Sequence, residues 1–416
     1  MRKLIVLPGY CDNLGGVLIS SSVLGVGFKS AQISEQLCLL ARSGSLLEQY
    51  LRQTNQDYCL QTIPARNRLE FVKRSLAWVQ QQPPDYPLLL DNCVSRELIP
   101  SLIRAAPALR WSGRSVHHIF RDLALSYNPL GRWARKLAFA CLNPAAICNS
   151  QFTAQHIRQH LVPNVGAILY PPIDLQRFKS RQISDTPPAD LKPIFDSGAQ
   201  IILTPSRISE PDKVNDKNLR ALLPVLAHLK ALGHRYHGVV IGQDASPGKT
   251  RTGDLLQLAE SLEVADCFTV LPPTFEIEKY YKYADLVLTL ALREPFGRTV
   301  AEAIACGVPV VGSNTGGVGE ILHHFAPEWT CDPHNPLAVA ETIIRLNADP
   351  NTLNLLAQGQ NWVKTNCNVT KYTRKIVEIT GLAAGVGAQC IAPLQPGITP
   401  VQISSCGFKE TEFGHE

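Results

Sequence analysis

Short, continuously apolar segments alternate with longer segments of mixed character along most of the chain. A short apolar segment bounded by turn residues is typical of a strand that is covered on both faces, as in a parallel sheet. We expect strands at residues 3–9, 86–92, 115–120, 145–150, 200–206, 236–242, 267–272, 284–290 and 308–314. The second half leaves room for one helix between successive strands, and in the first half we expect a helix over residues 29–44. The pattern predicts an α/β fold with doubly wound parallel sheets.

Chain length and a proline-rich segment divide this pattern in two. A chain of 416 residues exceeds the size at which one hydrophobic core keeps growing. Residues 169–193 contain five prolines and show no apolar periodicity, which is typical of an interdomain connection. We place the boundary near residue 185, which gives domains at 1–185 and 186–380, and the last helix of the second could pack back on the first. Residues 381–416 have glycine, proline and no sustained period, and we expect a flexible tail there.

The composition is that of a globular protein, with 45% hydrophobic and 18% charged residues. No segment approaches the roughly 20 apolar residues that cross a bilayer, and Pro, Gly and Asp interrupt the start before a signal peptide could form. We therefore expect a cytoplasmic protein. The 12 cysteines form no C-x-x-C pair, so we expect reduced core thiols and no zinc site.

Positive charge is concentrated in the first half of the chain. Residues 1–178 contain 19 Lys and Arg against 10 Asp and Glu, whereas the remainder contains 21 against 25. This asymmetry favours an anionic partner, or peripheral contact with the inner face of a membrane, and we expect no nucleic acid as partner. Residues 128–142 place three basic residues beside Trp133 and Phe139, which fits either a helix seated on an anionic membrane or a core helix with a solvated basic edge. We take the second interpretation.

The most informative segment is REPFGRTVAEAIACG, which follows a predicted strand. Ligands of doubly wound sheets collect beyond the carboxyl ends of the strands, so we expect Glu294, in the loop after the strand, to face a cleft. Gly297 lets the backbone approach a ligand, and the amides from Gly297 to Val300 open a helix that begins near Arg298 and would seat a phosphate. Glu302, one turn further, can accept hydrogen bonds from two adjacent hydroxyls, as on a ribose.

A bound diphosphate needs cations, and three are candidates. Arg207 ends the first strand of the second half and could hold a diphosphate as a bidentate fork. Lys217 opens the next helix and could add a point charge, with Lys213 as its competitor. Each of them taken alone could also be a solvated surface charge.

Residues 200–365 resemble the donor-binding domain of retaining glycosyltransferases of family 4, the group 1 glycosyltransferases with the GT-B fold of two facing doubly wound domains. The family signature E-P-F-G-x-x-x-x-E appears at residues 294–302, and GVPVVGSNTGGVGEI follows it. The family also has an Arg at a strand end and a Lys before a helix, usually at a shorter spacing than here. Lys213 fits that spacing and Lys217 fits the helix register, and we favour Lys217. The first half matches the family less well.

The resemblance implies that the second domain binds a nucleotide-sugar donor. Glu294 would bind hydroxyls of the transferred sugar, Arg207 and Lys217 the diphosphate, and Glu302 the ribose. Base contacts are expected from backbone groups around residues 270–273. The sugar and phosphates would be lined by backbone groups of Phe296, Gly297, Arg298 and Thr299.

For the first domain the resemblance implies two further contacts. A glycine-rich loop after the first strand touches the donor phosphate in the family, and Gly15 and Gly16 stand at that place, although they also fit a plain strand-to-helix turn. A family histidine near the end of a middle strand lies close to the reacting sugar, and His117 and His118 are the candidates here. Because side chains alternate along a strand, only one of the two is expected to face the cleft.

We therefore predict a retaining glycosyltransferase that moves a sugar from a nucleotide-diphosphate sugar to an unidentified glycan, lipid or small-molecule acceptor. No two aspartates stand two positions apart, so the metal-binding Asp-x-Asp of other glycosyltransferases is absent from the sequence, and we expect no metal and no further cofactor. The alternatives are a nucleotide-sugar epimerase or hydrolase on the same fold, or a catalytically silent nucleotide-sugar-binding protein.

Overall fold

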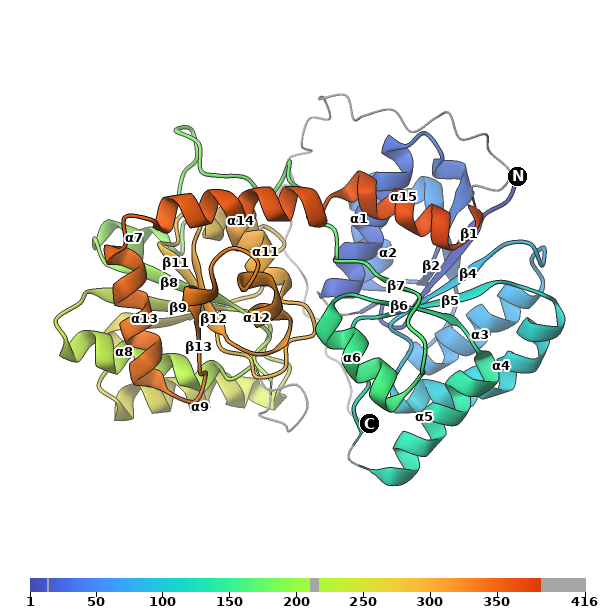
Figure 1. Cartoon of the computed structure of the whole chain (residues 1–416), viewed down its shortest axis with the longest axis horizontal. Coiled ribbons are helices and arrows are strands. Elements are labelled where there is room, and N and C mark those ends of the chain that lie inside the picture. The colour runs from blue at the N-terminus through green and yellow to red at the C-terminus, as the bar shows by residue number, and fades with distance from the viewer. Residues whose placement is uncertain (13–14, 127, 210–216, 383–416) are drawn as a thin grey trace.

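The computed structural model describes residues 1–12, 15–126, 128–209 and 217–382. They form two lobes that lie side by side, each built on one parallel sheet with helices above and below it (Figure 1). The doubly wound α/β architecture predicted from the sequence is confirmed.

The first lobe contains a seven-stranded sheet in the order β3-β2-β1-β4-β5-β6-β7. Its strands are β1 Leu4–Pro8, β2 Leu37–Arg42, β3 Leu60–Ile63, β4 Leu88–Asp91, β5 Val116–Phe120, β6 Ala145–Cys148 and β7 Ala167–Ile168. Its helices are α1 Gly16–Ser30, α2 Leu46–Gln53, α3 Arg68–Gln80, α4 Ile99–Trp111, α5 Pro129–Leu142 and α6 Gln151–His160. The strand order reverses beside β1, so the carboxyl ends of β1 and β4 form the switch point at which ligands of such sheets bind.

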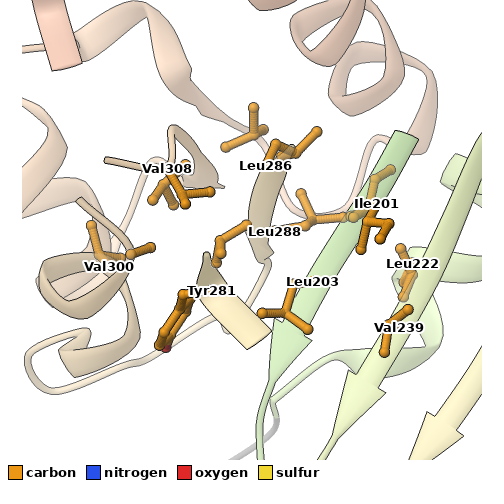
Figure 2. Close-up of a cluster of buried hydrophobic side chains, with 14 of the residues drawn as sticks. Ile201, Leu203, Leu222, Val239, Tyr281, Leu286, Leu288, Val300 and Val308 are labelled. Atoms are coloured by element: carbon orange, nitrogen blue, oxygen red, sulfur yellow. The ribbon is translucent and has the colours of Figure 1, made fainter. Parts of the chain in front are cut away.

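The second lobe contains a six-stranded sheet in the order β10-β9-β8-β11-β12-β13. Its strands are β8 Gln200–Pro205, β9 Tyr236–Ile241, β10 Phe268–Leu271, β11 Leu286–Thr289, β12 Val310–Ser313 and β13 Thr330–Cys331. Its helices are α7 Lys192–Asp196, α8 Leu222–Ala231, α9 Thr250–Ser261, α10 Ile277–Tyr281, α11 Arg298–Ala305, α12 Gly316–Leu322, α13 Pro336–Ala348 and α14 Thr352–Asn366. Apolar side chains of the central strands pack against α8 and α11 in its core (Figure 2).

All nine predicted strands are present, but the helix predicted over residues 29–44 is wrong. That segment contains β2, which pairs in parallel with β1 and β3 and is largely buried, so burial in the sheet outweighs the helix propensity of its leucines. The helix of this region is α1, which ends at Ser30, just inside the segment, and is rich in Ser and Gly. Because Ser and Gly are weak helix formers, the sequence did not predict this helix.

The chain crosses between the lobes twice. Residues 169–191 lead from β7 to the second lobe, and α15 (Val369–Ile379) returns to lie beside α1 (Figure 1). Tyr372 and Ile376 of α15 are buried in the core of the first lobe. A Cβ atom at Gly27 of α1 would lie 1.9 Å from the hydroxyl oxygen and 3.1 Å from the Cβ atom of Thr373, so α15 packs closely on α1 at this glycine. Of the predicted tail, residues 383–416 lie outside the described ranges.

Two further observations concern the helices and the cysteines of the described ranges. Within the ranges that the structure describes, no helix combines the length and apolar character needed to cross a bilayer. The cysteines in those ranges are all free, and most of them are buried, as predicted. Burial raises the pKa of the Cys11 and Cys148 thiols to about 12, so they are not nucleophiles near neutral pH.

Candidate functional site

The loop between β11 and α11 lies against the start of α12. Gly297 has a φ of +87°, a left-handed conformation that favours glycine, and α11 begins at Arg298 as predicted. The backbone amide of Gly317 donates to the carbonyl of Glu294 over 2.7 Å. A Cβ atom at Gly317 would lie 2.4 Å from the Cα atom of Phe296, so this approach requires glycine. The glycine pair at the start of α12 therefore fixes the loop that carries Glu294.

The side chains of Lys217 and Glu294 form an ion pair, and each is 21% exposed. The neighbouring Asn218 donates from its side-chain amide to the carbonyl of Leu290 over 3.3 Å, which ties the segment before α8 to the end of β11. This tie brings Lys217 to the Glu294 loop. The competing candidate, Lys213, lies outside the described residues.

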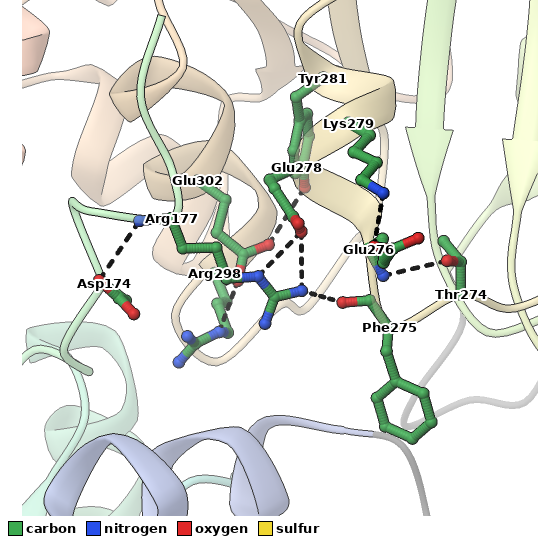
Figure 3. Close-up of polar contacts among 10 residues, drawn as sticks. All are labelled: Asp174, Arg177, Thr274, Phe275, Glu276, Glu278, Lys279, Tyr281, Arg298 and Glu302. Atoms are coloured by element: carbon green, nitrogen blue, oxygen red, sulfur yellow. Dashed lines mark hydrogen bonds and ion pairs between the residues drawn. The ribbon is translucent and has the colours of Figure 1, made fainter. Parts of the chain in front are cut away.

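Glu302 is buried in the first turns of α11 and is already paired. Its carboxylate accepts hydrogen bonds from Arg298 Nε over 2.7 Å and from the hydroxyl of Tyr281 over 3.2 Å (Figure 3). Burial, reinforced by the Glu302 carboxylate, raises the pKa of Tyr281 well above its usual value, so the phenol stays protonated and donates. The two donors fix the orientation of the Glu302 carboxylate.

Arg177 is a site residue that sequence analysis did not identify. It lies in the segment YPPIDLQRF, within residues 169–193, for which the sequence predicts only an interdomain connection. Its Nε donates to Glu278 over 2.8 Å, and its Nη2 donates to the carbonyl of Phe275 (Figure 3). The one sequence signal that could have identified Arg177 is its position as a cation between a Pro-Pro pair and the predicted domain boundary.

A cavity between the two lobes gathers most of the predicted donor-binding residues. The first lobe contributes Gly15, Gly16 and Ile19 at the start of α1, opposite the start of α11. Arg207 lines the cavity, is exposed, and forms no ion pair with any residue in the described ranges. The remaining lining residues are Arg177, Phe178, Pro205, Ser206, Ile241, Gly242, Gln243, Pro273, Thr274, Phe275, Ile277, Arg298, Thr299 and Glu302.

Some predicted residues lie beside this cavity and not in its lining. Glu294, Lys217 and Gly297 belong to the loop system next to Thr299, which itself lines the cavity. The ring of Phe296 is buried and stacks on Tyr170 with 5.7 Å between ring centroids, so only its backbone is available to a ligand.

The two candidate histidines are buried within the first sheet and do not line the cavity. The Nε2 atom of His118 accepts a hydrogen bond from the Cys93 amide over 3.1 Å, and its ring packs against those of Phe120 and Phe139. Burial lowers the pKa of His118 to about 3 and that of His117 to about 4. The expectation that one of them faces the cleft is not supported, because helices cover both faces of this sheet and strand alternation leads into a core on either side.

Nothing in the described ranges forms a group of three or more His, Cys, Asp and Glu side chains placed to hold a metal ion. The positive groups at the cavity are instead side chains and backbone amides. Arg207 is the one with no acidic partner among the described residues, whereas Lys217 and Arg298 are paired with the two glutamates of the motif.

Comparison with known proteins agrees with this geometry. Residues 194–361 match the model of the family described as glycosyl transferases group 1. The chain is 32% identical to a D-inositol 3-phosphate glycosyltransferase of Salinispora arenicola over 43% of this chain and 41% of that protein. It is 28% identical to one of Streptomyces bingchenggensis over 51% and 47%. The chain thus spans less than half the length of these curated relatives.

Solved structures resemble the whole described chain. The Anabaena protein HepE, solved in complex with UDP and glucose, has a TM-score of 0.73 at 17% identity, with 92% of this chain and 100% of that chain covered. The sucrose-phosphate synthase of Thermosynechococcus elongatus has a TM-score of 0.67 at 16% identity, with 92% and 99% covered. At these identities the likeness shows the fold, which is the GT-B arrangement of two Rossmann-like domains.

Proposed function

We propose that this chain, a member of the group 1 glycosyltransferases through residues 194–361, transfers a sugar from a nucleoside-diphosphate sugar to an acceptor held by the first lobe. The observation that carries the proposal is the composition of the cavity. It combines an exposed cation, Arg207, with the opening turn of α11, the oriented carboxylate of Glu302 and two glycines from the opposite lobe.

Each part of the donor has a chemical counterpart at this cavity. The diphosphate would bind between Arg207 and the first amides of α11, because the start of a helix favours negative charge. The ribose hydroxyls would donate to Glu302, and hydroxyls of the sugar to Glu294. Lys217 would give up part of its ion pair with Glu294 and contact the diphosphate, because a diphosphate carries more negative charge than one carboxylate.

Gly15 and Gly16 allow the first lobe to approach the donor closely. A Cβ atom built on either residue would meet no atom within 4 Å, so the space in front of them is open. We infer that a phosphate oxygen takes this space. A Gly16→Val variant should then lose donor binding while its melting temperature stays that of the wild type.

In the proposed reaction the bond between the sugar C1 and the diphosphate oxygen breaks, and a bond from C1 to the acceptor oxygen forms on the same face. Negative charge grows on the leaving diphosphate, where Arg207, Lys217 and the α11 amides would stabilise it without reorganising. The leaving diphosphate would take the proton from the acceptor hydroxyl. Glu294 would position the sugar and form no covalent bond, and the anomeric configuration would be retained.

Proton NMR of the product tests this reaction, because the coupling at C1 distinguishes retention from inversion. A panel of UDP, GDP and ADP sugars should first be screened by thermal shift, since a ligand at 100 times its Kd adds about 2.7 kcal/mol to stability. The curated relatives are named for action on D-inositol 3-phosphate, so phosphorylated polyols are the first acceptors to test. UDP sugars come first among donors because HepE was solved with UDP and glucose.

The two alternative functions predict different results when donor and products are analysed in this way. A hydrolase would consume the donor completely without an acceptor, and an epimerase would invert a carbon of the donor sugar. A silent binding protein would bind the nucleotide sugar and release it unchanged. The presence of Arg207 and Glu302 at one cavity, with Glu294 in the loop beside it, favours transfer over silent binding.

We also propose that the first lobe contacts a membrane surface peripherally. Leu130, Trp133 and Leu137 of α5 are 77%, 64% and 37% exposed, and helical periodicity places them on one face. Arg132 and Lys136 are exposed on the adjoining face. The core-helix interpretation of α5 explains its buried residues but not this apolar stripe.

Charge and a neighbouring residue support the same interpretation. Trp111, at the end of the adjacent α4, is 90% exposed, and Arg110 Nη1 donates to the carbonyl of Cys141 near the end of α5 over 3.5 Å. Residues 98–173 contain eight Lys and Arg and a single acidic residue, Asp122. An apolar stripe that contains an indole ring and lies beside cations fits an anionic lipid interface.

Vesicle sedimentation tests the membrane contact. The chain should sediment with phosphatidylcholine vesicles that contain phosphatidylglycerol, and not with phosphatidylcholine alone. A Trp133→Ala variant should lose most of this binding, whereas Leu353→Ala, which removes an apolar side chain on α14 that is 77% exposed, should not. Equal binding by both variants would contradict the proposal.

A further inference from the structure

The start of α6 in the first lobe meets α12 of the second (Figure 1). The carboxylate of Glu320, in α12, accepts hydrogen bonds from the backbone amides of Gln151 and Phe152 over 2.9 and 2.8 Å. The hydroxyl of Tyr170, in the connection between the lobes, donates to the same carboxylate over 2.9 Å. A side chain of one lobe thus caps a helix of the other.

This cap completes the hydrogen bonding of α6. A helix leaves its first four backbone amides without intrahelical partners. In α6 the amides of Gln151 and Phe152 bond Glu320, and that of Thr153 bonds Ser150 Oγ over 2.9 Å. The next amide, that of Ala154, makes the first intrahelical bond, to the Ser150 carbonyl over 3.0 Å. The first turn of α6 contains no acidic residue of its own. Glu320 therefore supplies, from the second lobe, the negative charge that the start of a helix favours.

The same helix start holds the loop that carries Glu294. The hydroxyls of Ser150 and Thr153 both donate to the carbonyl of Pro295, that of Thr153 over 3.0 Å, and both side chains are completely buried. The preceding carbonyl, that of Glu294, accepts from the Gly317 amide over 2.7 Å. Two successive carbonyls of the loop are thus held, one by each lobe.

We propose that Ser150, Thr153 and Glu320 form an interdomain clasp that positions Glu294 for the transferred sugar. They are positioning residues, because they act through the Pro295 carbonyl and α12 and touch no reacting atom. This inference rests on the proposed function, which assigns the sugar hydroxyls to Glu294. Small displacements of a positioned group cost much activity, so a clasp that fixes this loop serves the sugar end of the donor.

The clasp makes a prediction that general destabilisation does not. UDP lacks the sugar that Glu294 would bind, so loosening the loop should weaken binding of a nucleotide sugar and spare UDP. Thr153→Val removes the hydroxyl and keeps the shape, whereas Thr153→Ser keeps the hydroxyl. In calorimetry we expect Thr153→Val to bind UDP within about twofold of wild type and UDP-glucose about tenfold more weakly, as for one lost hydrogen bond in a site. Thr153→Ser should behave as wild type.

A matched control exists in the second lobe. Thr342 is also a buried helical threonine, and its hydroxyl donates to the Ala338 carbonyl of its own helix over 2.8 Å, away from the cavity. Thr342→Val should leave the ratio of the two Kd values unchanged. If Thr153→Val left the ratio unchanged too, or weakened UDP and UDP-glucose equally, the positioning role would be overturned.

Amide hydrogen exchange on the full chain tests the clasp independently of function. In Glu320→Gln the amides of Gln151 and Phe152 lose a charged acceptor and should exchange about ten times faster than in wild type. Unchanged exchange there would overturn the clasp itself. If wild type bound UDP but no nucleotide sugar and transferred no sugar, the proposed function would fail and the positioning role with it, whatever the exchange rates show.

Discussion

Lys217 and Glu294 lie 77 residues apart in the sequence and form an ion pair beside the cavity between the lobes, each with 21% of its side chain exposed. The pair joins the segment before α8 to the loop before α11. It holds one cation and one carboxylate at the place where we propose that the diphosphate and the sugar of a donor meet. The proposed chemistry uses the two groups separately, so their pairing keeps both in position before a donor binds.

Replacing Glu294 by Gln should remove most turnover and spare nucleotide binding. The amide keeps the size of the side chain and loses the charge that accepts strongly from sugar hydroxyls. We expect turnover to fall at least about 100-fold and the Kd for UDP to change less than about threefold. Steady-state assays and calorimetry measure the two effects, with the exposed Glu341→Gln as control. Intact turnover would remove Glu294 from the site.

The Lys217–Glu294 pair should matter little for stability. Both side chains are partly exposed, and such pairs typically contribute below about 1 kcal/mol. A double-mutant cycle of Lys217→Met and Glu294→Gln, followed by urea denaturation, should therefore give a coupling energy under about 1 kcal/mol. Lys217→Met should nevertheless weaken UDP binding about tenfold, because it removes a cation from the proposed diphosphate site. UDP binding equal to that of wild type would assign the second cation to Lys213 or to none.

Two glycines with opposite surroundings test the packing of the Glu294 loop. A Cβ atom at Gly317 would lie 2.4 Å from the Cα atom of Phe296, whereas one at Gly253, in α9, would meet no atom within 4 Å. Gly317→Ala should lose about 1–3 kcal/mol of stability and most activity, because backbone must move. Gly253→Ala should gain about 0.5–1 kcal/mol, as alanine favours a helix. Equal denaturation midpoints would show that the loop does not need the glycine.

The buried histidines should make stability fall in mild acid. Burial lowers the pKa of His117 to about 4 and that of His118 to about 3, while the unfolded chain takes up protons near the usual 6.5. Below pH 6.5 the unfolded state therefore binds more protons, and the free energy of unfolding decreases as pH falls toward 4. Each histidine contributes about 1.4 kcal/mol per pH unit in that window.

Urea denaturation at pH 7 and at pH 5 measures this dependence. The double variant His117→Gln and His118→Gln should show a shallower loss between the two values than wild type. The exposed His334→Gln should lose as much stability as wild type. A wild-type free energy of unfolding that is the same at both pH values would contradict the buried, neutral state of the two rings.

The sequence predicted the elements of the second lobe well because their signals are local. β8, β9, β11 and β12 are each built around a short apolar run, and α11 follows a Pro-x-Gly turn that ends the loop before it. The first lobe was harder. β2 carries helix-forming leucines, and its strand state depends on pairing with β1 and β3, which are distant in the chain. Contacts of that kind leave no periodicity in a single sequence.

The residues of the candidate site show the same contrast between local sequence signals and contacts that only the fold reveals. Arg207, Gly16 and Thr299 come to one cavity as their positions after strands predict. Arg177 could not be assigned, because its role follows from the path of the chain between the lobes. His118 shows the limit of motif reasoning, since strand alternation does not reveal whether the far face of a sheet is open or covered by helices.

The most direct test of the proposed diphosphate site is to measure by calorimetry how tightly UDP binds to wild type and to Arg207→Met in the presence of EDTA. We propose that side-chain cations and the amides of α11 hold the diphosphate, so wild type should bind UDP equally well with EDTA or with magnesium, and Arg207→Met should bind UDP about tenfold or more weakly. UDP binding that requires magnesium and is unaffected by the loss of Arg207 would contradict it.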